Sequence, residues 1–480
     1  MTPDPIPIRI AVIGSGPAGF YAAGHLLKAS GEGVEVDMLE RLPTPWGLVR
    51  SGVAPDHPKI KSVTRIYEKT AAHPRFRYFG NVSFGEHVSR EELLEHYHAV
   101  VYATGSPSDR PLGIPGEDLP GSHAATEFVG WYNGHPDHTD LEVDLLSAER
   151  AVVVGNGNVA IDVARMLVLA PAELAPTDTA DHALDVLAAS QVKEVVVLGR
   201  RGPAQAAFTN PELLELGELS DADVIVDADE LERALAVEDL QAAEDATSRR
   251  NIEILRSYAE RTPAGHPKRI VLRFLLSPVA LLADQNGRLG AVELIHNELV
   301  PTSDGGLRAQ ATEQRETIQA GLLFRAIGYR GIPLPGVPFD ERSAVIPNTQ
   351  GRVLDQQSGS PLPGEYVVGW IKRGPSGVIG TNKKDAQETV DAMLVDLPGL
   401  AAANGNGSAP ATDARAATHA PANPDGAAVE NLLRSRQPQL VTYSGWQAID
   451  RHERALGEPS GRPRVKLTRI DELLRVAAAE

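Results

Sequence analysis

Cysteine is absent from this sequence of 480 residues. The chain therefore forms no disulfide, and it offers no thiolate to a metal ion, to an iron–sulfur cluster or to a CxxC redox exchange. A disulfide reductase that works through its own cysteines is excluded. Any redox chemistry that the protein performs must take place on a bound cofactor.

Basic residues are too few to balance the acidic ones. Lysine and arginine number 46 against 64 aspartates and glutamates, which gives a formal net charge of −18. This balance argues against a protein whose main partner is nucleic acid or an anionic membrane. The chain also lacks an apolar run of about 18 residues and a basic amino-terminal stretch followed by an apolar one, so neither a membrane span nor a secretory signal is expected. We therefore expect a cytoplasmic protein.

Two stretches have the pattern of a strand, a glycine-rich turn and a helix. The first occupies residues 8–40, and the second begins at Ala151 and is followed by a strand near Val192. Such βαβ units build parallel sheets. The sequence therefore predicts an α/β protein with two nucleotide-binding domains. A third strand–turn–helix pattern follows in residues 365–394.

Three further segments carry structural signals. Residues 270–300 are predicted to form antiparallel strands around an Asn286-Gly287 hairpin turn. Residues 400–430 are rich in alanine, proline, asparagine and glycine, and are predicted to form a disordered linker. Residues 431–480 regain tryptophan, leucine and valine, and are predicted to pack on the body of the protein.

The first glycine-rich turn, residues 14–19, has the sequence GSGPAG and fits the GxGxxG pattern. Gly14 makes the turn, Gly16 lets backbone N–H groups approach a pyrophosphate, and Gly19 lets the helix pack on the strand. Glu40 ends the next strand, where an acid accepts hydrogen bonds from ribose hydroxyls. The pattern predicts a dinucleotide site, with a purely structural turn as the alternative.

The second glycine-rich turn, residues 155–160, has the sequence GNGNVA, and the strand that follows ends in Arg200 and Arg201. Two arginines bind a 2′-phosphate, which a carboxylate would repel, so this site is predicted to prefer NADP. A solvated turn is the alternative for the arginine pair. The interval from Gly155 to Arg200 exceeds the usual ~20 residues, which an inserted stretch explains.

The difference between the two sites predicts two different nucleotides, FAD at the first and NADP at the second. Residues 103–105 (ATG) are predicted to cross near the FAD pyrophosphate. Residues 377–380 (GVIG) are predicted to open a helix whose N–H groups stabilise a reduced flavin. Ordinary turns are the alternative for both segments.

Longer strings carry a resemblance to a known family. They include MLERLPTPWGLVRSGVAPDHPKIK, RFRYFGNV, GNGNVAIDVAR, GRRGPAQAAFT and EYVVGWIKRGPSGVIGTNKKDA, and they span most of residues 8–395. The chain resembles the adrenodoxin-reductase-like family of NADPH–ferredoxin reductases, particularly the bacterial members. The resemblance implies two Rossmann-like domains, with an NADP-binding domain of residues 108–323 inserted into an FAD-binding domain made of residues 1–107 and 324–399.

The resemblance also implies binding residues for both nucleotides. Those for FAD are Gly14, Gly16, Ala18, Gly19, Glu40, Leu48, Val82, Trp370, Gly377, Val378 and Ile379. Those for NADP are Asn156, Gly157, Asn158, Val159, Arg200, Arg201 and Glu212, with Trp370 and Gly377 near the nicotinamide. No metal is expected.

The implied reaction is hydride transfer from NADPH to the flavin, followed by single-electron transfer to an iron–sulfur ferredoxin. The resemblance places His57 and Glu215 near the flavin as candidate catalytic residues. His57 is expected to tune the flavin potential or relay a proton, and a structural histidine is the alternative. Glu212 also fits the preference of a helix start for an acid. Leu214 stands where family members often carry an arginine, so the sequence does not predict which charged residues pair around this position.

An acidic ferredoxin needs a basic surface on this acidic chain. Residues 249–273 contain seven lysines and arginines against two glutamates, a local reversal of the overall charge. The candidate docking residues are Arg249, Arg250, Arg256, Lys268 and Arg269. A solvated helix face followed by a hairpin is the alternative.

Three other functions remain open on the sequence. A flavoprotein that reduces quinones or free flavin has the same two nucleotide sites. A flavin monooxygenase would show substrate-stimulated NADPH oxidation and a hydroxylated product. A non-enzymatic NADP-sensing module would bind NADP without the yellow colour of a flavoprotein.

Overall fold

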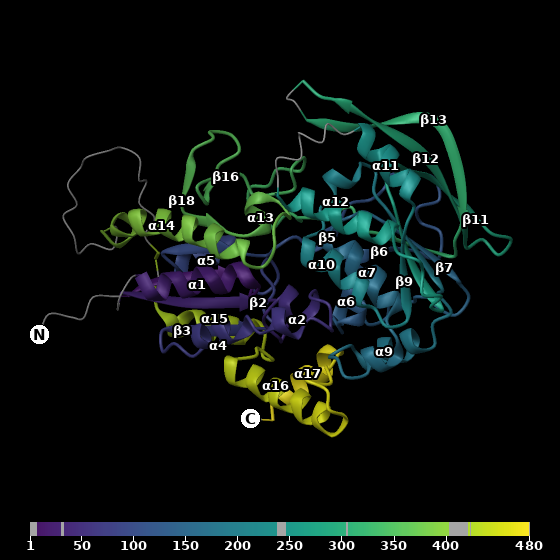
Figure 1. Cartoon of the computed structure of the whole chain (residues 1–480). Coiled ribbons are helices and arrows are strands. Elements are labelled where there is room, and N and C mark those ends of the chain that lie inside the picture. The colour runs from purple at the N-terminus through teal and green to yellow at the C-terminus, as the bar shows by residue number, and fades with distance from the viewer. Residues whose placement is uncertain are drawn as a thin grey trace, which may run out of the picture.

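Two parallel-stranded sheets, each covered by helices, make up the two halves of the protein (Figure 1). The structure is a computed structural model, and it describes residues 7–29, 33–237, 246–303, 306–402, 421–422 and 424–479. The predicted α/β architecture of two Rossmann-like units, one inserted into the other, is confirmed. The strands of the first sheet come partly before and partly after those of the second sheet in the sequence.

The first sheet has seven strands. Their order is β16 (Asn348–Thr349), β17 (Arg352–Leu354), β18 (Pro361–Val367), β4 (Ala99–Tyr102), β1 (Ile8–Ile13), β2 (Val34–Glu40) and β3 (Phe76–Gly80). The last five run parallel, while β16 and β17 are antiparallel. In β1, Ile10 and Val12 belong to one buried cluster, and Ala11 and Ile13 belong to another. A continuous apolar run therefore supplies both faces of the sheet.

Helices cover both faces of the first sheet. Helices α1 (Pro17–Ala29) and α14 (Thr381–Ala402) pack along each other and contribute to one buried cluster. Helices α5 (Arg90–His96) and α15 (Gly426–Arg436) contribute to the other. Three short helices lie near the carboxyl edge of this sheet, namely α2 (Leu48–Ser51), α3 (Pro58–Lys61) and α13 (Trp370–Arg373). Helix α4 (Thr64–Ala71) packs on α1.

The second sheet has six parallel strands. Their order is β6 (Ser122–Ala124), β14 (Leu322–Arg325), β7 (Arg150–Val154), β8 (Glu194–Leu198), β10 (Lys268–Arg273) and β9 (Ala222–Val226). The helices around it are α6 (Ala125–Tyr132), α7 (Asn158–Val168), α8 (Pro171–Leu174), α9 (Asp181–Ala188), α10 (Asn210–Glu215), α11 (Ala228–Val237) and α12 (Ala246–Ala259), with single turns η1 (Pro136–His138), η2 (Pro203–Gln205) and η3 (Leu216–Glu218).

The prediction of antiparallel strands over residues 270–300 is partly wrong. Strand β10, which contains residues 270–273, is a central parallel strand of the second sheet. Strands β11 (Leu276–Ala283), β12 (Leu289–Pro301) and β13 (Leu307–Gln319) form a separate antiparallel sheet that extends from the body. The Asn286-Gly287 turn is confirmed, with a φ of +74° at Gly287. A short apolar strand has the same pattern in either kind of sheet, so the sequence did not separate them.

Two chain crossings join the halves. Strand β5 (Ser108–Asp109) pairs antiparallel with β15 (Tyr329–Arg330), so both crossings lie side by side. The second sheet ends at Arg325, two residues beyond the boundary predicted at 323. The assignment of the halves as FAD and NADP domains with those boundaries remains a prediction.

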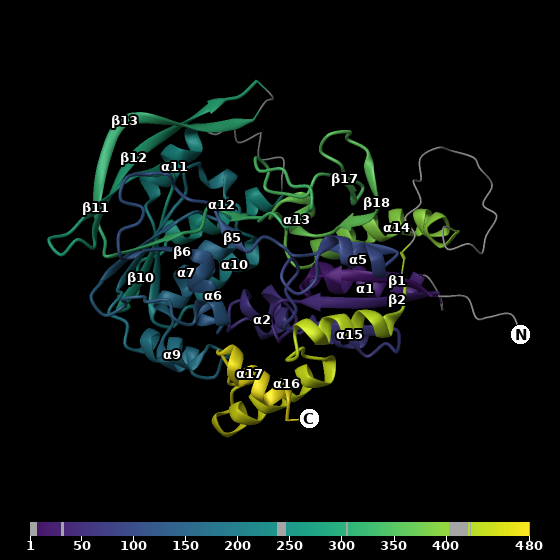
Figure 2. The ribbon, with the colours of Figure 1, turned by 180° about the vertical axis from the view of Figure 1, so that it is seen from behind.

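The carboxyl-terminal segment contacts both halves, through Glu453 with Arg50 of the first and through Arg462 with Asp181 of the second, and its last part lies beneath them in Figure 1. It contains α15, α16 (Tyr443–Gly457), η4 (Glu458–Ser460) and α17 (Ile470–Ala477). Trp446 and Leu473 are buried in the core of the first half. Figure 2 shows the same arrangement from behind.

The predicted linker of residues 400–430 is wrong at both ends, because residues 400–402 belong to the end of α14. Residues 403–420 and 423 lie outside the described part of the chain, and residues 426–430 open α15. The Asp425 side chain accepts a hydrogen bond from the N–H of Ala427 and caps that helix. Because this stretch is rich in alanine, the sequence did not predict that a helix begins here. None of the described helices is long and apolar enough to cross a membrane.

Candidate functional site

The first glycine-rich turn lies at the carboxyl end of β1, the edge where parallel sheets hold ligands. Gly14 has a φ of +104°, and a Cβ there would lie 2.6 Å from the carbonyl oxygen of Ala103. A Cβ at Gly19 would lie 2.2 Å from the carbonyl oxygen of Gly14. A Cβ at Gly16 would meet no described atom within 4 Å. Packing therefore requires the outer glycines, and the middle one faces open space that suits a pyrophosphate.

Glu40 fixes this turn. Its carboxylate accepts hydrogen bonds from the N–H of Ser15 at 3.0 Å, from the Ser15 hydroxyl at 2.6 Å and from the N–H of Leu42 at 3.0 Å. The N–H of Val82 donates to the Glu40 carbonyl oxygen at 2.9 Å, which brings Val82 to the same place. The sequence did not indicate the role of Ser15, which is fully buried. A contact of Glu40 with ribose remains a prediction.

The other residues expected at FAD approach the same turn. A Cβ at Gly47 would lie 2.9 Å from the Cα of Gly16, so Leu48 follows directly beside the turn. A Cβ at Gly369 would lie 2.5 Å from the Cβ of Ala18, so Trp370 approaches the turn from the carboxyl end of β18, at the same edge of the sheet.

Residues 377–379 lead into helix α14, which begins at Thr381 rather than within the glycine segment. Ile379 packs against the buried cluster that contains Ala18. Val378 is 54% exposed and Leu48 is 37% exposed. Two apolar side chains that face outward beside a dinucleotide turn suit the apolar ring of a flavin.

The second glycine-rich turn repeats the first at the end of β7. Gly155 has a φ of +132°, and a Cβ there would lie 2.2 Å from the carbonyl oxygen of Ala326. Gly157 is the N-cap of α7, and its surroundings are open. The Asn158 side chain accepts a hydrogen bond from the N–H of Thr209 at 2.8 Å, and the Asn156 carbonyl accepts from Ala207 and Phe208. Val159, beside them on α7, packs against the core of this half.

Arg200 and Arg201 lie beside that turn. They follow Gly199, where a Cβ would lie 2.8 Å from Nδ2 of Asn156. Their backbone carbonyls accept hydrogen bonds from Asn297 and Leu275. Within the described ranges, neither guanidinium has a hydrogen bond or an ion pair, and Arg200 is exposed. Two cations without a carboxylate partner suit a phosphate.

His57 lies where the two halves meet. Its Nε2 atom is 2.8 Å from Oε2 of Glu215 on α10 and 2.7 Å from NH1 of Arg165 on α7. Glu212 lies 4.0 Å from the same nitrogen. Arg165 also pairs with Asp56, the neighbour of His57. The structure thus brings together three residues expected at the site, namely His57, Glu212 and Glu215.

Arg165 was not among the site residues predicted from the sequence. It follows Asp162 by three residues on α7, so both lie on one helix face, and their side chains are 3.4 Å apart. That Asp-x-x-Arg spacing directly after a GxGxxA turn was the available signal. Leu214, at the position where an arginine was expected, is 42% exposed, and Arg165 supplies the cation of the network instead.

Carboxylates outnumber cations around His57. Burial, and then the charge of Glu212, raise the pKa of Asp162 well above its ordinary value. Burial also raises the pKa of Glu212, against an opposing effect of His57. Glu212 Oε2 is buried without a hydrogen-bond partner among the described residues. The site therefore favours a proton on this pair of carboxyls, or a cationic group beside them.

The ligand atoms of His57, Glu212 and Glu215 lie within 4.8 Å of one another, a spacing that a metal ion can use. The guanidinium of Arg165 already lies against two of these groups as a cation. The expectation that the protein holds no metal remains a prediction.

The positive charge of the segment 249–273 is partly balanced in the structure by carboxylates from other parts of the chain. Arg256 pairs with Glu232, Arg269 with Glu194, and Arg273 with Glu230 and Glu316, and all four carboxylates come from outside the segment. Arg250 pairs with Glu253. Burial lowers the pKa of Lys268, which donates to the carbonyl oxygen of Leu167. Lys268 and Arg269 belong to β10, whereas Arg249, Arg250 and Arg256 belong to α12.

The fold and the paired turns define a two-dinucleotide oxidoreductase. Residues 8–201 match the sequence model of the pyridine nucleotide-disulphide oxidoreductase family. The chain is 53% identical over 472 residues to NADPH-ferredoxin reductase FprA of Mycobacterium leprae, with 98% of each chain covered. It is 39% identical to the mitochondrial NADPH:adrenodoxin oxidoreductase of Arabidopsis thaliana, with 98% of this chain and 96% of that protein covered.

A solved structure of Mycobacterium tuberculosis FprA in complex with NADPH superposes with a TM-score of 0.89 at 52% identity, covering 98% of this chain and all of that one. The chain belongs to the family of NADPH–ferredoxin reductases that includes FprA and adrenodoxin reductase. The resemblance drawn from the sequence motifs is thereby confirmed.

Proposed function

We propose that this protein is an FAD-dependent NADPH–ferredoxin reductase whose two nucleotides meet at His57. Relatives named as NADPH–ferredoxin reductases cover nearly the whole chain and support this function. A bound FAD would supply the chemistry of accepting a hydride from NADPH and releasing electrons one at a time, which fits an iron–sulfur ferredoxin as acceptor.

The first turn is the proposed FAD site. Backbone N–H groups around Gly16, at the start of α1, bind the pyrophosphate, because the outer two glycines close the turn and leave the middle one open. Leu48 and Val378 contact the ring, and Trp370 lies beside Tyr329, with ring centroids 5.0 Å apart. The absence of cysteine is consistent with redox chemistry carried by the cofactor alone.

The second turn is the proposed NADP site. Residues 156–159 bind the pyrophosphate at the start of α7, and Arg200 and Arg201 bind the 2′-phosphate. Glu212 lies on the nicotinamide side, next to His57.

The observation that carries the proposal is the contact of His57 with Glu215 and Arg165. His57 belongs to the half with the first turn, and its partners belong to the half with the second. The rings bound at the two turns would meet at this place, where the buried His57 and the partly exposed Glu212 and Glu215 orient the nicotinamide. No protein nucleophile is required.

The test is an anaerobic titration of the purified, yellow protein with NADPH, followed by mixing with an iron–sulfur ferredoxin. Bleaching of the flavin by NADPH and its recovery on adding oxidised ferredoxin are expected. A protein that stays colourless with excess FAD contradicts the proposal and supports an NADP-binding module. A flavin that reoxidises with quinone but not with ferredoxin contradicts the ferredoxin assignment.

The docking site of the ferredoxin belongs to the same proposal. Helix α12 carries the docking candidates Arg249 and Arg250 near its start, and Arg250 pairs with Glu253 of the same helix. Arg256 and Arg269 contribute less because carboxylates pair with them, and Lys268 contributes less because it is partly buried and donates to the carbonyl oxygen of Leu167. A cytoplasmic location also remains a prediction.

A further inference from the structure

A buried charge network holds the segment that carries His57. This segment, residues 48–61, contains only α2 and α3, which have four residues each. Helices of one turn are not stable by themselves, so tertiary contacts must fix their position. The contacts come from the carboxyl-terminal segment and from the second half of the protein.

The α2 end of the segment is fixed through Arg50. Its guanidinium donates to both carboxylate oxygens of Glu453, at 2.8 and 2.5 Å, and lies 5.3 Å from the ring centre of Trp446. The Glu453 side chain is completely buried. A buried two-bond pair of this kind sets both the position and the orientation of the arginine.

The α3 end is fixed through Lys61. Its Nζ atom donates to Oδ1 of Asp178 at 2.6 Å, and Asp178 lies in the second half of the protein. Lys466, from the carboxyl-terminal segment, lies 3.3 Å from the other oxygen of Asp178 and donates to the backbone carbonyl of Arg50 at 3.2 Å. One ammonium group therefore joins the two ends of the segment.

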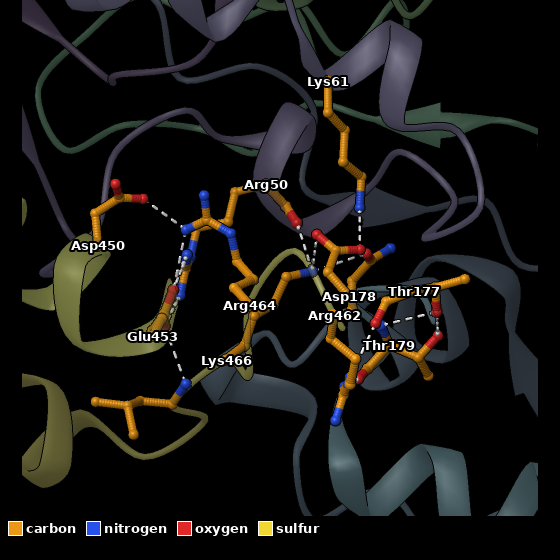
Figure 3. Close-up of polar contacts among 12 residues, drawn as sticks. Arg50, Lys61, Thr177, Asp178, Thr179, Asp450, Glu453, Arg462, Arg464 and Lys466 are labelled. Carbon is orange, nitrogen blue, oxygen red and sulfur yellow. Dashed lines mark hydrogen bonds and ion pairs between the residues drawn. The ribbon is translucent and has the colours of Figure 1, made fainter. Parts of the chain in front are cut away.

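Figure 3 shows Lys61, Asp178 and Lys466 converging, with Arg50 and Glu453 beside them. Lys466 is 4% exposed and Asp178 is 6% exposed. Arg462 donates to the backbone carbonyls of Thr177 and Thr179, which holds the loop on both sides of Asp178. Removing one member of such a buried network leaves an uncompensated charge, so the members hold one arrangement.

We infer that Asp178 and Lys466 are positioning residues for hydride transfer, because they hold the segment 48–61 so that His57 meets Glu215 and Arg165. The inference rests on the proposed function. Neither residue touches the turns that bind the nucleotides, and both act through His57. The carboxyl-terminal segment thereby acts on the reaction through His57.

The experiment is a double-mutant cycle on the flavin-loaded enzyme. Asp178→Asn keeps the shape of the side chain but removes the charge that Lys61 and Lys466 share. The rate constant of flavin reduction by NADPH is measured by anaerobic stopped flow, with and without His57→Gln. We expect Asp178→Asn to slow the step about tenfold in the wild-type background, and less than about twofold when His57 is already replaced.

Asp140→Asn is the matched control. Asp140 also pairs with the carboxyl-terminal segment, through Arg469 at 2.8 and 2.5 Å, but both side chains are exposed and neither touches residues 48–61. The rate should not change in this variant. If Asp178→Asn fails to fold, Lys61→Gln breaks the same contact from its less buried side, and the same cycle applies.

Equal slowing in both backgrounds, or no slowing, overturns the inference, since a purely structural role does not depend on His57. The proposed function fails separately, if NADPH does not reduce the flavin of the wild-type protein at all.

Discussion

The Nε2 atom of His57 and the Oε2 atom of Glu215 lie 2.8 Å apart, although 158 residues separate them and they belong to different halves of the protein. The contact exists because the two halves pack against each other here, with His57 on the first and Glu215 and Arg165 on the second. Arg165 lies against both side chains, and its positive charge partly balances the surrounding carboxylates.

Replacement of either partner should slow flavin reduction. His57→Gln retains a hydrogen bond but removes the imidazole that Arg165 and Glu215 share, and Glu215→Gln removes the charge. We expect the rate constant of flavin reduction by NADPH to fall about tenfold in each, with a KM for NADPH changed less than about twofold. His452→Gln, an exposed histidine of α16, is the control. An unchanged rate in both variants would show that the contact is structural only.

Arg200→Ala combined with Arg201→Ala should change the nucleotide preference. Each guanidinium is free to make charge-assisted hydrogen bonds, so their loss should raise the KM for NADPH at least about tenfold and leave that for NADH nearly unchanged. Steady-state kinetics with both nucleotides measure the difference. Arg233→Ala, an exposed arginine of α11, should affect neither. Equal rises for NADPH and NADH would refute the 2′-phosphate assignment.

The middle and last glycines of the first turn should respond differently to alanine. A Cβ at Gly16 meets open space, so Gly16→Ala should fold normally but bind FAD roughly tenfold more weakly, because the methyl group blocks the pyrophosphate. A Cβ at Gly19 overlaps the Gly14 carbonyl, so Gly19→Ala should lower the free energy of unfolding by about 2 kcal/mol. Flavin content and urea unfolding of the apoprotein separate the two effects. Loss of stability in both variants would argue that Gly16 is structural.

His123 should make the protein less stable in mild acid. Burial, and then the charges of Arg325 and Arg288, lower its pKa to about 4, and its ring stacks on Phe324 with centroids 5.6 Å apart. The unfolded chain takes up a proton at this histidine below pH ~6.5, whereas the folded protein does not until about pH 4. Stability therefore falls as the pH falls through this window.

His123→Gln removes the titrating group. The fall in the free energy of unfolding between pH 7 and 4.5, measured with urea, should be about 2 kcal/mol smaller in the variant than in the wild type. His266→Gln, at an exposed site in the same half, should keep the wild-type dependence. An identical pH dependence in the wild type and His123→Gln would contradict the assignment.

Arg249→Gln combined with Arg250→Gln should slow ferredoxin reduction and spare dye reduction. Loss of two charges at the start of α12 weakens the attraction to an acidic ferredoxin, so the second-order rate constant should fall several-fold at low salt and converge with that of the wild type at high salt. Arg308→Gln, on the exposed strand β13, is the control. A parallel loss of dye reduction would place the effect in the nucleotide sites instead.

Signals confined to a few adjacent residues could be predicted from the sequence. The two glycine-rich turns, the hairpin at Asn286-Gly287 and the strand–turn–helix before α14 all stand where they were expected. Strand β10 and the start of α15 could not be placed, because a short apolar run or an alanine-rich stretch fits more than one environment.

The sequence alone determined that any redox chemistry takes place on a bound cofactor, since the chain has no cysteine. It also predicted two unlike dinucleotide turns, since six adjacent residues and the end of the next strand define each. Only the tertiary structure decided that Arg165 meets His57 and that Lys466 joins Arg50 to Asp178. It also decided that carboxylates from other elements pair with Arg256, Arg269 and Arg273. Charges act through space, and their partners are set by the packing of the two sheets and not by their order in the chain.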